Sequence, residues 1–324
     1  MPKIRWEAAG YRRSMLRAVF LLAVFCGSAQ AFPTKPVRFI VPFPPGGATD
    51  IIGRLVAGKM QEVWGQAVIV ENRPGAGTVV GTDMVAKSAP DGHTLGMVVT
   101  AHVINPSLRA NMPYDTLRDL AAVTHVSVQH LVIAAHPSVP ANNVEELIAL
   151  ARKSPGKLSY ATPGSGTAMH LSVELLKAQA GIDIVHVPYK GGAPAQQDVM
   201  GGRVPILLDV LYAVQPLINS GKIKAIALLS PQRVSHLPVV AETVPGVSAL
   251  SIVGIVTAGA TPRELVQKIS ADIAKAVRSS DLTQRMTQLG MEPVGSTPAE
   301  FDALIRSEIE KWSRVVKISG AKAD

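Results

Sequence analysis

Three glycine-rich segments contain the residue types that could bind an anion. They span residues 42–50, 163–167 and 189–195, and each follows a predicted strand and precedes a predicted helix. Glycine lets backbone N–H groups approach a ligand closely, and a helix N-terminus adds unpaired donors and a partial positive charge. Such segments favour binding of a carboxylate or phosphate without any lysine or arginine.

Polar side chains next to these segments extend the candidate site. Thr49, Ser165 and Thr167 add hydroxyl donors at the predicted helix starts. Asp50 fits a first-turn acid that holds its loop in shape. His170 lies one turn into the second helix and either borders the site or bonds to a neighbouring loop. Asp209 follows a predicted strand and either lines a cleft or caps the next helix.

Two other interpretations of the glycines remain open. Each segment could be only a tight connection, although recurrence in both halves of the chain favours a ligand site. Gly75, Gly77 and Gly81 loosely resemble a dinucleotide fingerprint, but they follow the second strand of their unit, and a lone fingerprint is a weak signal. No G-x-S-x-G, Walker or H-E-x-x-H motif is present. The sequence therefore gives little support for enzyme chemistry, and the absence of cysteine after residue 31 argues against a zinc site.

The elements that position these residues alternate along the chain. Strands are predicted at 37–42, 68–71 and 94–99, with helices over 51–63 and near 82–87. The pattern restarts with strands at 131–135, 158–161, 184–187, 204–208 and 224–229, and with helices at 143–153 and 168–180, where Asn143 is the expected N-cap. Such alternation predicts βαβ units and a mainly parallel sheet in each half.

The last quarter of the chain is mainly helical. A strand at 251–256 is followed by predicted helices over 262–278, 282–289 and from Thr297 to about 318. Thr297 and Glu300 have capping-box spacing. We expect these helices to fold back on the first sheet. The predicted organisation is lobe 1 at 32–133 plus 234–324, lobe 2 at 134–233, and a cleft between them.

Residues 1–31 resemble a cleavable secretory signal. A basic stretch with five Lys/Arg precedes the apolar run 18–26, and Ala29-Gln30-Ala31 is an A-x-A site that predicts cleavage after Ala31. The alternative is a membrane anchor, but the run is shorter than the roughly 20 residues of a spanning helix. Arg12-Arg13 matches a twin-arginine signal poorly, and a start at Met15 would also give a complete signal.

Cleavage changes the composition of what remains. The segment contains Cys26, the only cysteine, so the exported protein has no disulfide. Removing its five basic residues and one acidic residue leaves 27 Lys/Arg and 23 Asp/Glu, a net charge of +4. That mild excess suits an anionic ligand and does not indicate nucleic-acid binding. We expect a soluble exported protein, and the family resemblance described next implies a monomer in the periplasm.

Motifs along the whole exported chain resemble one known family, the periplasmic solute-binding receptors of tripartite tricarboxylate transporters, often called Bug proteins. The landmarks include the three glycine segments and those at 70–77, 90–95, 104–108, 160–171, 186–191, 259–262 and 311–312. The resemblance implies an α/β type II periplasmic-binding-protein fold, with two lobes of mixed, mostly parallel sheets that close on a ligand about a hinge.

It also implies how the ligand is bound. A small carboxylate solute would be held by the first-lobe loop 43–50 and the second-lobe loop 162–167, with no cofactor and no catalysis. The candidate ligand-binding residues are then Phe43, Pro45, Gly46, Gly47, Thr49, Asp50, Thr162, Gly164, Ser165, Gly166, Thr167, His170, Lys190, Gly191 and Asp209. The implied partners are membrane permease subunits. A sensor that presents its ligand to a membrane sensor kinase and an exported α/β enzyme remain the alternatives.

The chain departs from the family at three places. It has Leu208-Asp209 where the family often has Phe-Asp, Pro216-Leu217 where Pro-His is frequent, and Ile252-Val253-Gly254 where a Trp-x-Gly is often found. These positions are expected to border the variable part of the ligand, so the sequence does not name the substrate.

Overall fold

A parallel three-stranded arrangement begins the folded chain. The computed structural model describes residues 32–321 except residue 235, so the predicted signal, its cleavage site and Cys26 lie outside the described residues. Strand β1 (Val37–Val41) pairs in parallel with β2 (Val68–Asn72) and β3 (Thr94–Val99). Helices α2 (Ala48–Trp64), α3 (Val79–Ala86) and α4 (Ala101–Leu108) and the 3-10 turn η2 (Ala76–Thr78) connect them or follow them. All six residues of β3 are buried, as expected for a central strand.

The second sheet repeats this pattern. Strand β5 (Ser159–Thr162) pairs in parallel with β6 (Val185–Pro188) and β7 (Ile206–Val210). Its helices are α5 (Val144–Lys153), α6 (Ala168–Ala180), α7 (Gly192–Met200) and α8 (Leu211–Asn219). Asn143 caps α5 by accepting a hydrogen bond from the Glu146 N–H, as predicted. Val132, Ala161 and Leu207, all 0% exposed, belong to the core of this half.

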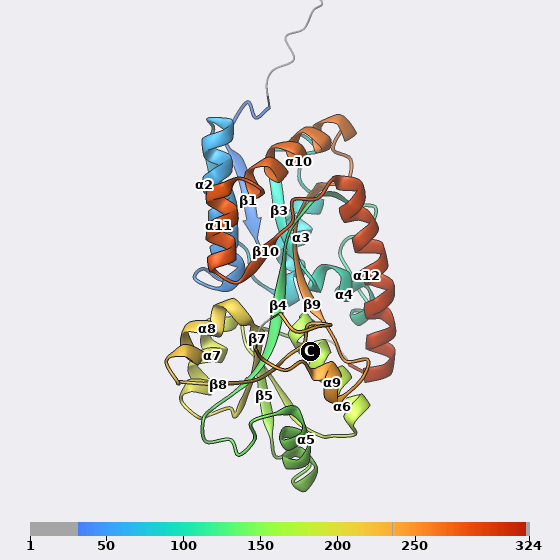
Figure 1. Ribbon diagram of the computed structural model, residues 1–324. Coiled ribbons are helices and arrows are strands. Elements are labelled where there is room, and N and C mark those ends of the chain that lie inside the picture. Colours follow the sequence, from blue (N-terminus) through green and yellow to red (C-terminus); the bar gives the residue numbers. More distant parts are fainter. Residues whose placement is uncertain (1–31, 235, 322–324) are drawn as a thin grey trace, which may run out of the picture. The chain divides into compact units, whose positions relative to one another are not determined.

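One long strand joins the two sheets. In β4 (Leu120–Ala135), residues 120–130 pair antiparallel with β9 (Leu250–Ala258), and residues 131–135 pair with β7 and with β8 (Lys224–Leu228). Figure 1 shows β4 passing from one half of the sheet to the other. Because β9 also pairs antiparallel with β3, the main strand order is β2-β1-β3-β9-β4-β7-β5-β6, and β8 and β10 pair with β4 outside this order. The sheet is therefore mixed, with parallel pairs in both outer parts and antiparallel pairs at the centre.

The C-terminal helices return to the first sheet, as expected. Helix α10 (Arg263–Val277) contacts α2 and β4, α11 (Ser280–Gln288) follows it, and β10 (Met291–Pro293) pairs with β4. Helix α12 (Pro298–Ser319) has the predicted capping box at Thr297 and Glu300. It contacts α4 and β4 and also α6, so it packs against elements of both sheets. The lobe boundaries at 133/134 and 233/234 remain a prediction.

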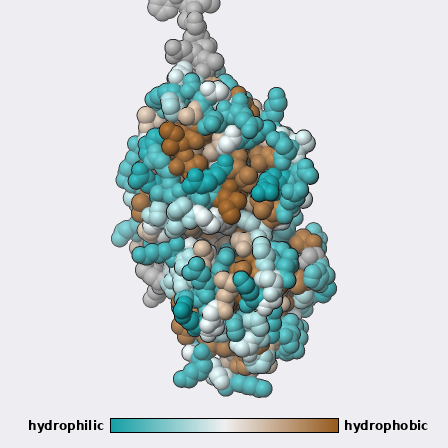
Figure 2. All heavy atoms as spheres, turned by 90° about the vertical axis from the view of Figure 1, so that its left-hand side faces the viewer, coloured by the Kyte–Doolittle hydropathy of each residue, from teal (hydrophilic) through white to brown (hydrophobic). Residues whose placement is uncertain are grey.

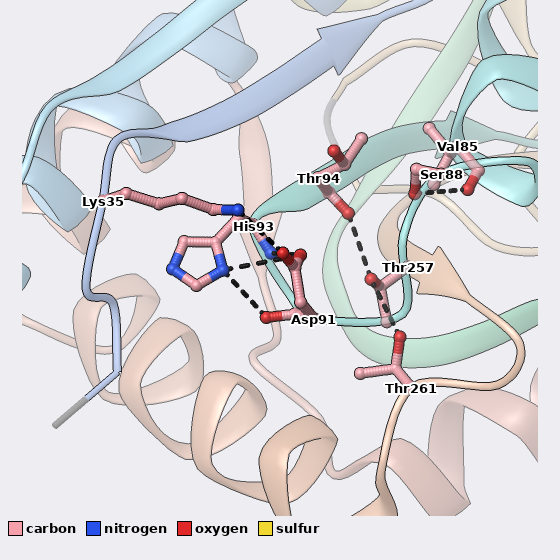
Figure 3. A network of polar contacts seen from close by, with 8 residues as sticks. All are labelled: Lys35, Val85, Ser88, Asp91, His93, Thr94, Thr257 and Thr261. Carbon is pink, nitrogen blue, oxygen red and sulfur yellow. Dashed lines mark hydrogen bonds and ion pairs between the residues drawn. The ribbon is translucent and has the colours of Figure 1, made fainter. Parts of the chain in front are cut away.

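The sequence landmark at 90–95 is a structural turn. The Lys35 Nζ donates to Asp91 Oδ2 at 2.9 Å, and Asp91 Oδ1 accepts from the His93 N–H at 3.0 Å. Thr257 on β9 donates to the Thr94 carbonyl at 3.0 Å (Figure 3). These contacts hold the start of β3 against β1 and β9. The other end of β3, at Val99, borders the cavity described below. The network therefore fixes the strand that leads to the site, at the end of the strand away from the cavity.

The face that carries α2 is largely hydrophilic, with separate hydrophobic patches (Figure 2). Among the helices that the structure describes, none is both long enough and apolar enough to cross a bilayer.

Candidate ligand-binding site

A cavity of about 160 Å³ lies where the three glycine-rich segments meet. It is smaller than the pockets that hold drug-sized molecules, so it suits a small solute. The walls come from both sheets. They include these residues of the three segments: Phe43, Pro44, Pro45, Gly46, Gly47 and Thr49; Pro163 and Thr167; and Lys190, Gly191, Gly192, Ala193 and Pro194.

Helix N-termini dominate the cavity wall. Residues of the first turn or N-cap of α2, α4, α6, α7 and α8 all line it. Among the residues that the structure describes, no side chain at the N-cap position caps α2, α4, α7 or α8. Each helix start carries N–H donors and a partial positive charge of roughly half a unit. A wall of this kind favours an anion over a cation.

Two of these helix starts were not predicted as part of the site. Thr100 and Ala101 begin α4, and Val210 to Ala213 begin α8. Sequence analysis located the strands before both helices but not the helices themselves. A strand followed directly by a short apolar helix, with no glycine turn, lacks the signal that identified the other three. Gln129 on β4, Gln196 on α7 and Ser251 on β9 also line the cavity without having been predicted.

Asp50 holds the first-lobe loop in shape. Its side chain is nearly fully buried and accepts hydrogen bonds from the Gly46 N–H at 2.9 Å, Arg54 Nε at 2.9 Å and Asn72 Nδ2 at 2.8 Å. Asn72 Nδ2 also donates to the Phe43 carbonyl. Burial acts to raise the pKa of Asp50, but these hydrogen bonds outweigh it and leave the pKa lowered. The carboxylate is therefore ionised. Its hydrogen bonds go to the loop and to the side chains that support the loop.

The second-lobe loop is held by its own hydroxyl groups. Thr167 Oγ1 donates to the Gly164 carbonyl at 2.8 Å and accepts from the His170 N–H as the N-cap of α6. Thr162 Oγ1 lies 2.7 Å from His186 Nε2. The Gly166 N–H donates to His170 Nδ1 at 3.2 Å, and the His170 and His186 rings stack with centroids 4.0 Å apart. His170 thus supports the loop.

The two lobes approach one another closely beside the cavity. A Cβ built on Gly191 would lie 3.7 Å from Pro44 Cδ, so the third segment reaches the first. A Cβ on Gly77 would lie only 2.8 Å from the Ser165 carbonyl oxygen, and one on Gly166 would lie 3.0 Å from Leu108. Gly77 and Gly166 both have positive φ, which glycine adopts readily. These glycines are needed for close backbone approach between the lobes.

Asp209 is the one acid among the described residues on the cavity wall. It is 2% exposed, and its oxygens accept from Gln196 Nε2 at 2.9 Å and the Val210 N–H at 2.8 Å. Burial raises the pKa of Asp209 to about 6, against the lowering effect of those two hydrogen bonds. Near neutral pH this carboxyl group can therefore exist in either protonation state.

Further donors surround Asp209. The Gln129 Nε2 and the Tyr212 hydroxyl are both buried, and the side chains of these two residues interact with one another. Burial, and next the charge of Asp209, raise the pKa of Tyr212 well above its usual value, so the phenol stays protonated. Lys190 lies on the wall with an exposed side chain. Because Gln129, Gln196 and Lys190 on the wall all carry N–H donors, this end of the cavity suits an oxygen acceptor.

The match to a family model decides the relationship. Residues 52–321 match the family described as "Tripartite tricarboxylate transporter family receptor". The chain belongs to this receptor family. The expected family and the two-lobe α/β fold are thereby confirmed.

Solved structures of related receptors support the same conclusion. An R. palustris protein solved with adipate is 34% identical, with a TM-score of 0.86 and coverage of 89% of this chain and 98% of that one. The periplasmic binding protein BugD is 31% identical, with a TM-score of 0.85 and coverage of 90% and 99%. MatC from Rhodopseudomonas palustris, solved with malate, is 29% identical, with a TM-score of 0.83 and coverage of 88% and 100%.

The predicted site residues of this receptor fall into two groups. Those on the cavity wall are Phe43, Pro45, Gly46, Gly47, Thr49, Thr167, Lys190, Gly191 and Asp209. Those not on the wall are Asp50, Thr162, Gly164, Ser165, Gly166 and His170, which lie in or beside the same loops. Contact of either group with a ligand stays a prediction. Among the described residues, no cluster of His, Cys, Asp and Glu has the arrangement of a metal site.

Proposed function

We propose that this receptor works in the periplasm, after cleavage following Ala31, as a monomer that captures a small carboxylate solute between its lobes. It then delivers the solute to the membrane permease subunits of a tripartite transporter. The convergence of five helix N-termini on one cavity of about 160 Å³ carries the proposal. Such a wall stabilises a small anion by backbone donors and helix charge.

The ligands of related receptors agree with that chemistry. The R. palustris protein was solved with adipate, and MatC was solved with malate. Both molecules carry carboxylate groups. For this chain we propose the same chemical class, with the ligand's first carboxylate at the starts of α2 and α6.

We propose that the lobes, at 32–133 plus 234–324 and at 134–233, move about β4 and the segment after β8. A ligand that accepts hydrogen bonds from both lobes stabilises the closed arrangement more than the open one. The contacts of Gly191 with Pro44, and of Ser165 with Gly77, are the kind that closure would form.

Binding is proposed to occur without turnover. The described residues on the cavity wall include Asp209 as the one acid and no histidine or cysteine. Nucleophilic catalysis needs a nucleophile and a base within hydrogen-bond reach of one another. The hydroxyl of Thr167, which lies on the wall, is already used to hold its own loop.

A thermal-shift panel of mono-, di- and tricarboxylates tests the binding step. A ligand at about 100 times its Kd adds about 2.7 kcal/mol to stability, which gives a clear rise in Tm. Gly192→Ala places a Cβ 2.8 Å from Asp209 Oδ2 inside the cavity wall and is expected to abolish the shift. Gly58→Ala, on the surface of α2 with no atom within 4 Å of the new Cβ, is the control and should keep it. No shift with any carboxylate would contradict the proposal.

Transport is tested in cells. Deleting the gene should abolish uptake of the carboxylate identified in the panel, and the wild-type gene should restore it while Gly192→Ala should not. Unchanged uptake in the deletion strain, with binding intact, would instead favour the sensor alternative.

A further inference from the structure

The polar end of the cavity is built around a buried acid with neutral partners. Asp209 accepts hydrogen bonds from Gln196 and Val210, and no described cation forms an ion pair with it. The Gln129 amide on the cavity wall and the buried Tyr212 hydroxyl, whose side chains interact with one another, are further hydrogen-bond donors in this region. The side chains of Gln129, Gln196 and Lys190 on this part of the wall are hydrogen-bond donors, whereas the Asp209 carboxylate is the one described group that adds a negative charge.

Other titratable groups on the elements packed against β7 are engaged away from Asp209. They are His130 with Glu292, Glu174 with Lys177 and Tyr160, Asp198 with Tyr189 and Arg203, His125 with the Ser127 carbonyl, and His170 with the Gly166 N–H. Tyr212 on α8 is the group that senses the charge of Asp209, and Lys190 is a cation on the cavity wall. A carboxylate ligand would therefore enter a small space that already holds the negative charge of Asp209, which no described side chain neutralises by an ion pair.

We propose that Asp209 takes up a proton when the ligand binds and donates a hydrogen bond to a ligand oxygen. This inference rests on the proposed function and deepens it, because it assigns the far end of the ligand an acceptor group, a second carboxylate or another oxygen, rather than an ammonium. Two negative charges in one enclosed site disfavour each other, so the proton is held by the acid. An ammonium group would instead keep Asp209 ionised.

In the ligand-free receptor, the pKa of Asp209 lies in a pH range in which binding can be measured. Its pKa is raised by burial to about 6 in the empty receptor. Ligand binding raises it further, so proton uptake occurs above pH 6, where the empty receptor is ionised. The association constant is then highest below about pH 6 and falls about tenfold per pH unit above it, until the pKa of the bound state is passed.

Calorimetry tests the inference on the purified receptor. Adipate, malate and their straight-chain homologues are titrated from about pH 5.5 to about pH 8 in buffers of different ionisation enthalpy, which gives the number of protons taken up. The expected result near pH 7.5 is an uptake approaching one proton per ligand, with the steep pH dependence given above. Asp209→Asn, which keeps the shape and cannot titrate, should show no uptake and a flat pH profile. Asp302→Asn, an exposed acid on α12, is the control and should match the wild type.

The outcomes separate this inference from the proposed function. Binding without proton uptake, or with uptake unchanged in Asp209→Asn, overturns the role of Asp209 while the receptor function stands. Proton release on binding also overturns it and indicates a cationic ligand group. Failure of every carboxylate to bind removes both. The wild-type proton count decides the matter even if Asp209→Asn does not fold.

Discussion

Asp50 offers the sharpest test of how the first-lobe loop is positioned. Asp50→Ala removes the acceptor of three hydrogen bonds, from the Gly46 N–H, Arg54 Nε and Asn72 Nδ2, and Asp50 is not itself one of the residues that line the cavity. The side chain is 3% exposed, so water cannot simply replace it. The loop that carries Gly46, Gly47 and Thr49 would lose its anchor.

The expected loss of unfolding free energy follows from these contacts. A buried donor left without an acceptor costs about 1–3 kcal/mol, and two of the three donors lie on the loop or its support. Arg54 is half exposed and can be rehydrated, so the loss of its pairing adds little to this. We expect Asp50→Ala to lower the free energy of unfolding by roughly 2–4 kcal/mol and to weaken carboxylate binding at least tenfold, because the loop donors lose their position.

The chain contains a matched control. Asp302 and Arg306 form an i,i+4 Asp–Arg pair like Asp50 and Arg54, with Nε to Oδ2 distances of 2.8 and 2.9 Å, but the Asp302 side chain is 44% exposed. Asp302→Ala should cost no more than about 0.5 kcal/mol and leave binding unchanged. Urea denaturation measures stability, and calorimetry measures affinity.

The pH dependence adds a second check. The hydrogen bonds lower the pKa of Asp50 in the folded state, so its stabilisation is present above the unfolded-state pKa of about 3.9 and is lost as the pH falls through the lower folded pKa. The difference between wild type and Asp50→Ala should therefore shrink below about pH 4. Equal losses of unfolding free energy in Asp50→Ala and Asp302→Ala would refute the role of Asp50 in holding the loop. Carboxylate binding by Asp50→Ala with the affinity of the wild type would also refute it.

Three further substitutions test other parts of the account. Gly254→Ala would place a Cβ 2.0 Å from the buried Phe301 ring, and urea denaturation should show a loss of roughly 3 kcal/mol. Thr297→Ala removes the capping box of α12 and should cost about 1 kcal/mol by the same measurement. Asp209→Asn should stabilise the empty receptor near pH 7.5 by about 2–3 kcal/mol, because ionisation of wild-type Asp209 lowers stability as the pH rises through about 6, and this advantage should vanish below about pH 4.

The local signals in the sequence predicted much of the fold. Strand β3 and helices α5 and α6 begin and end at the predicted residues, because β-branched runs, Asn143 and the glycine at 181 act locally. The start of β4 was missed. Residues 120–130 include Thr124, His125, Ser127, Gln129 and His130, all buried between neighbouring strands, and so many polar residues do not give a strand pattern.

The candidate site was predictable where it depends on glycine. The three turns were found because glycine before a helix is a local signal, and the structure brings them to one cavity. Gln129 and Ser251 could not be found in this way. They reach the cavity through the pairing of β4 with β9, a contact between residues over a hundred positions apart that no local pattern encodes.

Mass spectrometry of the receptor purified from its native source shows whether the bound molecule is a small carboxylate. The protein is measured first under native conditions and then after denaturation, so that any bound small molecule is released and identified. We expect each chain to release one small acid, which carries a carboxylate and a second oxygen-containing group. A released molecule without a carboxylate, such as a polyamine or a nucleoside, would contradict it.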